Sequence, residues 1–495
     1  MPASPHPART LKKVRSMIDD LERPLAAPPA AQLKGDSPSP LAHRDSFVAE
    51  ARDLLILAGP LIFTQLAQMA VLATDVVLLG RLSASALAAA AIGNTVYYFC
   101  WLVGSGPASA VSPMIAQLIG ARPKETAGVR HIARMGLWGA ILLPVPLTPI
   151  LLSTRWILDH LGQDPVLAMG AGQFAAMLCI GLPFSFGFQV LRNFATALGK
   201  PNAALWVMLS SIIFNGVLAW ALIFGHLGFP KMGLVGAGLA TSLSAVWAFL
   251  AMLVVIRMTV RLRAYRIFRR FHRPVWKKLR EIFMLGIPIG VTILFEAMLF
   301  NAMTLVVGTF GGAALAAHQV ALNFASVTFM VPMGVALAAT VRVGRFAGAG
   351  DREGARRAGF TAMVVGAALI SLFSVLMLVA GEQIGGLYIG GRDPASLEVI
   401  ALVGLFLKVA AAFQLFDALQ VVGAMSLRGL KDARMPMILA GVSYWLIGAP
   451  ICIVLGVTLK MEGLGVWIGL AIGLAAAAAA MCLRFHLLTR RTLPL

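Results

Sequence analysis

Long stretches without a charged residue constrain this chain more than any other feature. The clearest ones lie between Arg134 and Arg155, Lys231 and Arg257, Arg357 and Gly381, Arg434 and Lys460, and Glu462 and Arg484. Each has room for one helix of ~20 apolar residues, which is the length that crosses a bilayer. A transmembrane β-barrel would instead show ~10-residue segments of alternating polarity. With 59% hydrophobic and 13% charged residues over 495 positions, a soluble protein could not cover this much apolar surface.

The pattern predicts an all-α integral membrane protein with twelve transmembrane helices in two pseudo-symmetric six-helix lobes. We expect spans over roughly 55–79, 88–118, 132–152, 166–190, 203–225, 235–256, 282–307, 316–341, 358–380, 397–427, 435–457 and 464–483. The corresponding domains are a disordered N-terminal tail rich in Pro and Ala, an N-lobe, a basic linker, a C-lobe and a C-terminal tail. Their expected bounds are 1–50, 51–257, 258–280, 281–484 and 485–495.

An internal repeat supports the two-lobe organisation. At an offset of 228 positions Pro60 aligns with Pro288, and Gly80 aligns with Gly308. The string Leu87-Ala88-Ala89 aligns with Leu315-Ala316-Ala317 at the same offset. Duplicated apolar halves with equal helix numbers are typical of secondary transporters.

The net charge of +20 is distributed by topology. The linker from Arg257 to Arg280 holds ten Lys and Arg residues, whereas the loops on the opposite side hold one each: Arg81, Arg155, Lys231, Arg392 and Lys460. This bias predicts a multi-pass protein of the cell inner membrane with the linker and both termini in the cytoplasm. It favours contact with membrane lipid and argues against nucleic-acid binding.

Three carboxylates lie well inside predicted spans: Asp75, Glu296 and Asp417. Each costs ~2.5–3.5 kcal/mol at the centre of a membrane helix. A water-filled cavity, a bound cation or protonation must offset that cost, and the alternative is a purely structural carboxylate held by hydrogen bonds. At the 228 offset Glu296 aligns with Gln68 and Asp75 aligns with Met303, so the repeat does not duplicate the ionisable chemistry.

Polar and aromatic side chains share helical faces with these carboxylates. An apolar chamber with aromatics and a few carboxylates suits bulky organic cations. The candidates for substrate contact are Phe295, Phe300, Phe413, Tyr444, Gln319, Asn323 and Gln68. Two other groups stay open: Lys408 either snorkels outward or faces the cleft, and His318 is either a buried neutral ring or a proton relay.

Several strings resemble the multidrug and toxic compound extrusion (MATE) family, most closely its NorM-like branch. They include TDVVLLG at 74–80, LFEAMLF at 294–300, AAHQVALNFASVTFMVPMG at 316–334 and FDALQVVGAMSLRGLKD at 416–432. They occur in order and on the predicted spans, and the resemblance covers about 50–490. It implies a two-lobed fold and an antiporter that exports cationic, lipophilic drugs in exchange for Na⁺ or H⁺.

The resemblance also implies site roles. Glu296 and Asp417 match the acidic residues implicated in cation coupling, and Na⁺ would bind at these two positions. Asp75 matches an acidic residue implicated in coupling or substrate binding in the N-lobe. The basic, Pro/Ala-rich N-terminus and Lys408 are not part of the family motifs.

Other classes fit less well. A flippase for a lipid-linked or polysaccharide substrate is the alternative within the wider superfamily, although such proteins tend to have extra spans or a cationic cleft. We see no catalytic constellation, phosphate-binding loop or CxxC pair, so we expect a secondary active transporter and not an enzyme. We expect a monomer that needs no cofactor beyond its coupling ion.

Overall fold

A computed structural model describes residues 47–391 and 393–490. Within these ranges, twelve helical segments are long and apolar enough to cross a membrane. This number confirms the prediction from the sequence. Most of the predicted N-terminal tail and the last five residues lie outside the described residues, so the tails stay predictions.

The N-lobe contains six of the spans. They are α2 (Phe47–Leu82), α3 (Ala84–Ala121), α4 with α5 (Thr126–Leu142, Pro144–Leu152), α7 (Pro165–Ala197), α8 (Asn202–Phe224) and α9 (Gly233–Met258). The short helix α6 (Thr154–His160) precedes α7, and α10 (Val260–Arg263) lies in the linker. Only Leu143 separates the end of α4 from Pro144, the first residue of α5. The break falls here because proline cannot donate a helical hydrogen bond, and a new helix begins because proline fits the first turn.

The C-lobe repeats this plan. Its spans are α11 (Trp276–Gly308), α12 (Gly312–Gly348), α13 (Arg352–Tyr388), α14 (Pro394–Gly429), the segment Arg434–Thr458 and α17 (Glu462–Arg490). The segment Arg434–Thr458 consists of α15 (Arg434–Gly441), the π-helix η1 (Val442–Gly448), α16 (Ala449–Ile453) and the π-helix η2 (Val454–Thr458). Pro450 stands at the first turn of α16, and its missing N–H explains why the regular ladder is interrupted there.

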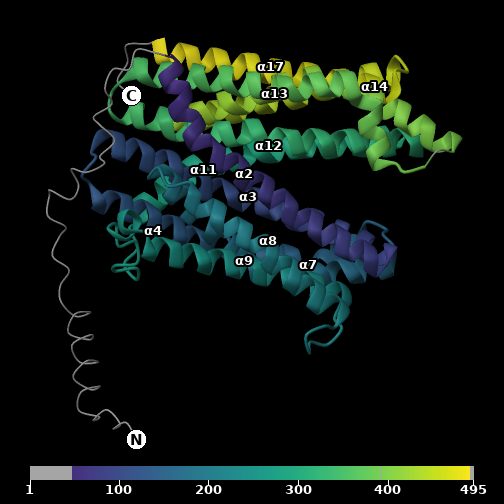
Figure 1. The fold of residues 1–495 in the computed structure, drawn as a ribbon, viewed down its shortest axis with the longest axis horizontal. Coiled ribbons are helices and arrows are strands. Elements are labelled where there is room, and N and C mark those ends of the chain that lie inside the picture. The colour runs from purple at the N-terminus through teal and green to yellow at the C-terminus, as the bar shows by residue number, and fades with distance from the viewer. Residues whose placement is uncertain (1–46, 392, 491–495) are drawn as a thin grey trace, which may run out of the picture. The chain divides into compact units, whose positions relative to one another are not determined.

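The first helix of each lobe packs against both lobes. Leu54 and Leu61, in the first half of α2, belong to the hydrophobic core of the C-lobe, whereas Leu78 and Leu79 pack on α8 and α9. Figure 1 shows α2, in purple, running obliquely from beside α12 toward the N-lobe helices.

Helix α11 makes the mirror arrangement. Ile282 and Ile289 lie in the N-lobe core, while Leu299 and Met303 lie in the C-lobe core. Ile282 and Ile289 are the repeat equivalents of Leu54 and Leu61 at the 228 offset. The two lobes are therefore joined by a reciprocal exchange of their first helices.

Glycines allow the backbones of the two lobes to touch. A Cβ on Gly106 of α3 would overlap the backbone of α11 at Gly286 and Gly290. Its repeat equivalent, Gly334 of α12, lies in the same way against Ile62 of α2. Small residues permit this approach because membrane helices associate through close packing.

The lobes also meet where α3 and α12 end. Gly120 lies against the Arg345 carbonyl, and its repeat equivalent Gly348 lies against the Gln117 carbonyl. The linker between α9 and α11 lies at this end of the bundle, because Arg134 of α4 donates hydrogen bonds to the carbonyls of Arg269 and Arg270. We call it the linker end.

Two reciprocal hydrogen bonds close the linker end. Gln117 Nε2 of α3 donates to the carbonyl of Gly429, the last residue of α14, at 2.9 Å. Arg345 Nη2 of α12 donates to the carbonyl of Ala197, the last residue of α7, at 2.7 Å. Gln117 and Arg345 are repeat equivalents. Each lobe thus satisfies the final carbonyl of a helix in the other lobe, a group that has no partner within its own helix.

An ion pair that the repeat does not duplicate adds to this contact. Arg342 of α12 donates from Nε to Glu50 of α2 at 2.8 Å and from Nη1 to Asp53 at 3.4 Å. Glu50 is 5% exposed, so water screens this pair less than it screens a surface ion pair.

We predict that Gly106→Ala destabilises the protein by about 1–3 kcal/mol, because the new methyl group has to displace the backbone of α11. Thermal unfolding of the purified protein in detergent measures the effect as a lower melting temperature. Gly59→Ala on α2 is the matched control, since no atom lies within 4 Å of its Cβ position. Equal melting temperatures for the two variants would contradict the proposed close contact.

Candidate functional site

Two carboxylates, a guanidinium and a phenol meet inside the C-lobe. Glu296 belongs to α11, Asp417 and Arg428 belong to α14, and Tyr444 belongs to η1. Glu296 interacts electrostatically with each of the other three. We call these four residues the acidic cluster.

The members of the acidic cluster differ in their access to solvent. Asp417 is 5% exposed, Arg428 is 6% exposed and Tyr444 is fully buried, whereas Glu296 is half-buried. Buried charges of one sign are costly among membrane helices, and Arg428 offsets part of that cost. Glu296 is the carboxylate that a ligand entering between the helices can reach most directly.

Helix geometry explains how the acidic cluster assembles. Asp417 and Arg428 are eleven residues apart, which is about three helical turns, so both lie on one face of α14 about 16 Å apart. Glu296 interacts with both of them. Gly441 lets α15 approach α11 closely, because a Cβ there would lie 3.1 Å from the Phe295 ring. Tyr444 follows within the π-helix, a feature often found at functional sites.

Within the described part of the chain, buried oxygens without a hydrogen-bond partner include Asp417 Oδ1 and the Tyr444 hydroxyl of the acidic cluster and the nearby Gln420 Oε1. A buried acceptor without a partner costs ~1–3 kcal/mol. No group of three or more His, Cys, Asp or Glu side chains able to hold a metal occurs among the described residues. Two carboxylates with neutral oxygens nearby fit a proton, a sodium ion or an organic ammonium better than a transition metal.

The third predicted carboxylate forms a separate site in the N-lobe. Thr241 Oγ1 of α9 donates to Asp75 Oδ2 at 3.0 Å, and Asn215 of α8 interacts with the same carboxylate. Asp75 is 9% exposed, and its Oδ1 has no close partner among the described residues. The structure therefore places Asp75 between N-lobe helices, apart from the acidic cluster.

Gln68, the repeat equivalent of Glu296, faces its own buried arginine. Arg192 Nη1 of α7 donates to Gln68 Oε1 and to Gln65 Oε1, each at 3.2 Å. Arg192 is 7% exposed. Both lobes thus set a buried arginine against this position, but the partner is a neutral amide in one lobe and a carboxylate in the other.

The predicted aromatic candidates lie around the acidic cluster. Phe300 of α11 and Phe413 of α14 pack edge to face with their ring centroids 5.9 Å apart. Phe413 also packs edge to face on Trp467 of α17 at 5.6 Å. Phe413 is 2% exposed and belongs to the packed C-lobe core, whereas Phe295 and Phe300 are half-buried.

The polar candidates of α12 do not join the acidic cluster. Gln319 and Asn323 are exposed, and Asn323 Oδ1 accepts a 3.0 Å hydrogen bond from Tyr388 of α13. His318 is fully buried, with Nε2 3.0 Å from Thr304 Oγ1. Lys408 lies on the exposed surface of α14, as expected for an outward-facing side chain.

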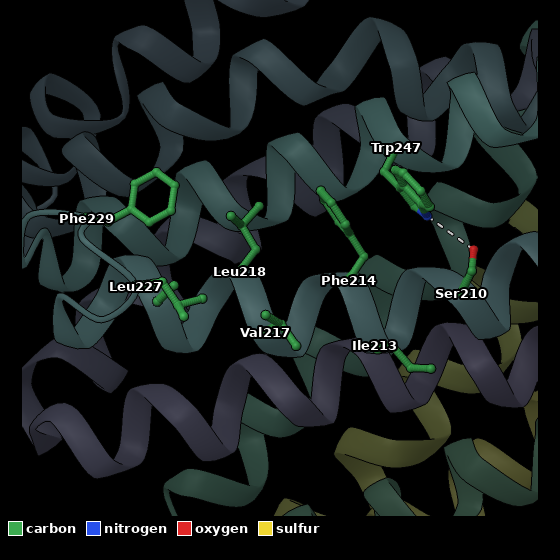
Figure 2. A pocket seen from close by; sticks show the side chains of 9 residues that line it. Ser210, Ile213, Phe214, Val217, Leu218, Leu227, Phe229 and Trp247 are labelled. Carbon is green, nitrogen blue, oxygen red and sulfur yellow. Dashed lines mark hydrogen bonds between the residues drawn. The ribbon is translucent and has the colours of Figure 1, made fainter. Parts of the chain in front are cut away.

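An apolar pocket of about 440 Å³ has none of these carboxylates in its lining. Figure 2 shows its lining, which includes Phe214 and Val217 of α8 and Trp247 of α9, with the Trp247 indole bonded to Ser210. Ile213 and Val217 are 71% and 52% exposed, so the pocket is a groove on the outer surface of the span. It is lined without a titratable side chain, and we therefore assign the site to the carboxylates.

Sequence reasoning missed the arginines and the Asp75 partners. The predicted spans end at 190 and 427, which leaves Arg192 and Arg428 in the loops that follow them. The eleven-residue spacing between Asp417 and Arg428 was the available signal for a shared helix face. No sequence signal linked Thr241 or Asn215 to Asp75, because these residues are far apart in the chain.

Comparisons with known proteins identify the family of the chain. A family model described as MatE matches residues 60–221 and 288–454. A "Probable multidrug resistance protein NorM" of Mesorhizobium japonicum is 41% identical over 437 residues, covering 88% of this chain and 93% of the relative. A protein of the same name from Burkholderia mallei is 39% identical over 440 residues, covering 88% and 92%.

Solved structures show the same fold. The crystal structure of the eukaryotic MATE transporter AtDTX14 superposes with a TM-score of 0.79 at 24% identity, covering 89% of this chain and 96% of the other. A crystal structure of MATE in complex with MaL6 gives 0.80 at 21% identity, with the same coverage. Two six-helix lobes with buried carboxylates define a multi-pass membrane transporter. The chain belongs to the MatE family, as the resemblance in its sequence predicted.

We predict that Arg428→Met lowers stability by on the order of 3 kcal/mol, because it leaves Glu296 without its counter-charge. Thermal unfolding in detergent measures the loss. The double variant Arg428→Met with Glu296→Gln should regain much of it, since the charge partner is removed as well. An unchanged melting temperature for the single variant would show that Arg428 does not offset the acidic cluster.

Proposed function

We propose that this protein is a multidrug efflux antiporter that exports cationic, lipophilic compounds in exchange for Na⁺ or H⁺ by alternating access. The acidic cluster carries the proposal, because Glu296 and Asp417 are brought together from α11 and α14 in a membrane-embedded site. The relatives named as probable multidrug resistance proteins support the substrate class.

The charges of the acidic cluster support exchange of one cation for another. With both carboxylates ionised and Arg428 protonated, the acidic cluster carries one unit of negative charge. A coupling ion or a drug ammonium can neutralise that charge, and both together would leave an excess positive charge in a low-dielectric site. Competition for Glu296 and Asp417 would therefore link ion entry to drug release.

Phe295 and Phe300 are the substrate contacts that fit this cycle best. Phe295 and Phe300 flank Glu296 on α11 and are half-buried. Aromatic faces attract organic cations and tolerate varied shapes. Asp75 with Thr241 would form a second coupling or substrate site in the N-lobe.

The positive-inside bias supports an orientation in the inner membrane. The basic linker lies at the linker end, so this end and both chain termini would face the cytoplasm. In the arrangement described here the lobes touch at the linker end, which corresponds to a transporter closed toward the cytoplasm.

Alternating access would require the linker-end contacts to break. The bonds from Gln117 to Gly429 and from Arg345 to Ala197 cross between the lobes and end on helices that carry site residues. Helix α14 carries Asp417 and Arg428, and helix α7 carries Arg192. A movement of α14 that follows neutralisation of the acidic cluster would thus act on the bond between its final carbonyl, at Gly429, and Gln117.

The combined variant Glu296→Gln and Asp417→Asn tests the function. We expect it to insert and fold normally but to lose ion-driven efflux of a fluorescent cation from proteoliposomes, because no carboxylate remains to alternate between ion and drug. Imposing a sodium gradient or a pH gradient separately identifies the coupling ion. Glu398→Gln is the matched control, since Glu398 is exposed at the start of α14. Full coupled transport by the double variant would refute the assignment.

The combined variant Gln117→Leu and Arg345→Leu tests alternating access. Each lost hydrogen bond removes about 1 kcal/mol from the stability of the closed arrangement. The population in which the lobes are separated at the linker end should therefore rise by roughly an order of magnitude or more. Spin labels at Lys124 and Glu353, in a background lacking the four native cysteines, report the separation by double electron–electron resonance. An unchanged distance distribution would contradict a role for these bonds in closing the linker end.

A further inference from the structure

Four arginines of the linker end converge without an acidic partner. Arg130 of α4 interacts electrostatically with Arg266, Arg269 and Arg270 of the linker. No salt bridge joins any of the four to a carboxylate in the described part of the chain. We call these residues the arginine cluster. Mutual repulsion disfavours such a grouping unless an anion is present.

The linker is fixed in place beneath these arginines. Arg134, which is 3% exposed, donates from Nη1 to the carbonyls of Arg269 at 3.3 Å and Arg270 at 2.8 Å. Trp138 Nε1 donates to the Phe271 carbonyl at 3.0 Å, and the two rings stack with centroids 5.9 Å apart. The backbone that carries the exposed linker arginines is therefore held in a defined conformation.

Buried side chains and backbone conformation reinforce this arrangement. Leu262 and Ile267 insert into the N-lobe core at 0% and 2% exposure. Arg266 and Arg270 adopt φ values of 46° and 57°, in the left-handed region that costs a non-glycine residue about 1 kcal/mol or more. Arg134 Nε, next to this turn, has no hydrogen-bond partner among the described residues. The left-handed backbone at Arg266 and Arg270 and the unpartnered Arg134 Nε thus each cost folding free energy at the place where these like charges are held together.

The position of the arginine cluster identifies its partner. Arg130 lies one turn into α4, and the charge-free apolar stretch that crosses the membrane begins after Arg134. Trp138, Phe268 and Phe271 surround the site, and aromatic rings are enriched where a bilayer meets water. Guanidinium groups match phosphate oxygens in a forked, charge-assisted geometry. We propose that the arginine cluster binds the phosphate-bearing headgroup of an anionic phospholipid.

The site adjoins the contact between the lobes. Tyr265, in the same linker, packs edge to face on Phe194 of α7 at 5.9 Å. Burial raises the pKa of Tyr265, and nearby Arg345 opposes that rise. Arg345 is the residue that donates to Ala197 across the lobes. A bound lipid would therefore hold the linker in place beside the contact between the lobes and favour the closed arrangement. This consequence rests on the proposed function, whereas lipid binding itself does not.

Native mass spectrometry of the full-length protein, taken from vesicles of phosphatidylcholine with and without phosphatidylglycerol, tests the proposal. The variant Arg266→Gln, Arg269→Gln, Arg270→Gln removes the linker part of the arginine cluster. The matched control Arg273→Gln, Lys277→Gln, Arg280→Gln removes the same charge from the end of the linker and the start of α11, at positions as exposed as the linker arginines of the cluster. We expect the first variant to retain phosphatidylglycerol about tenfold less than the control, because it loses charge-assisted hydrogen bonds.

Three results would overturn the proposal. Equal losses in the two variants would show that the linker attracts anionic lipid only through diffuse charge. Equal retention of phosphatidylcholine by the unmodified protein would show that the headgroup charge is not recognised. Complete displacement of phosphatidylglycerol by inorganic phosphate at millimolar concentration would identify a site for soluble phosphate. Both triple variants should keep the melting temperature of the unmodified protein, which separates loss of binding from loss of folding.

Discussion

The exchange of first helices between the lobes determines how the lobes are joined and where the carboxylates lie. The first halves of α2 and α11 pack in the opposite lobe's core, through Leu54 and Leu61 in one case and Ile282 and Ile289 in the other. Glycines at the crossings let the backbones touch. Both helices change lobe partway along their length. The second half of α2 carries Asp75 into the N-lobe, and the second half of α11 carries Glu296 into the C-lobe. The joint between the lobes and the placement of the carboxylates are therefore consequences of one packing arrangement.

On this symmetric frame the charged chemistry is asymmetric. The same repeat position is Gln68 in the N-lobe and Glu296 in the C-lobe, and each faces a buried arginine. Arg192 satisfies a neutral amide, whereas Arg428 compensates part of a pair of carboxylates. The N-lobe residue is neutral at this repeat position, whereas the C-lobe position adds a carboxylate that interacts with Asp417 and Arg428. The linker-end bonds from Gln117 and Arg345 are instead reciprocal, as expected for contacts that serve the joint between the lobes.

Much of the fold could be predicted because the bilayer imposes simple rules. Apolar length gives the spans, and the 228-residue offset gives the two lobes. The candidate site was only partly predictable. Glu296 and Asp417 stand out as costly charges and lie together, but Asp75 occupies a separate site with Thr241 and Asn215. Asn323 shares a helical face with Gln319, yet it bonds to Tyr388 of α13. Helical periodicity identifies a face and not the neighbour that covers it.

The membrane-spanning class, the number of spans, the internal repeat and the positions of charges inside the spans follow from the amino-acid sequence alone. They depend on local composition and on spacing along the chain, because a segment buried in lipid must be apolar and long enough to cross it. Three-dimensional packing was needed to see that Arg428 is a buried partner of Glu296, that α2 and α11 cross between lobes, and that the linker arginines converge on α4. Each of these depends on the close approach of residues far apart in sequence, and packing between helices fixes that approach without leaving a periodic trace in either segment.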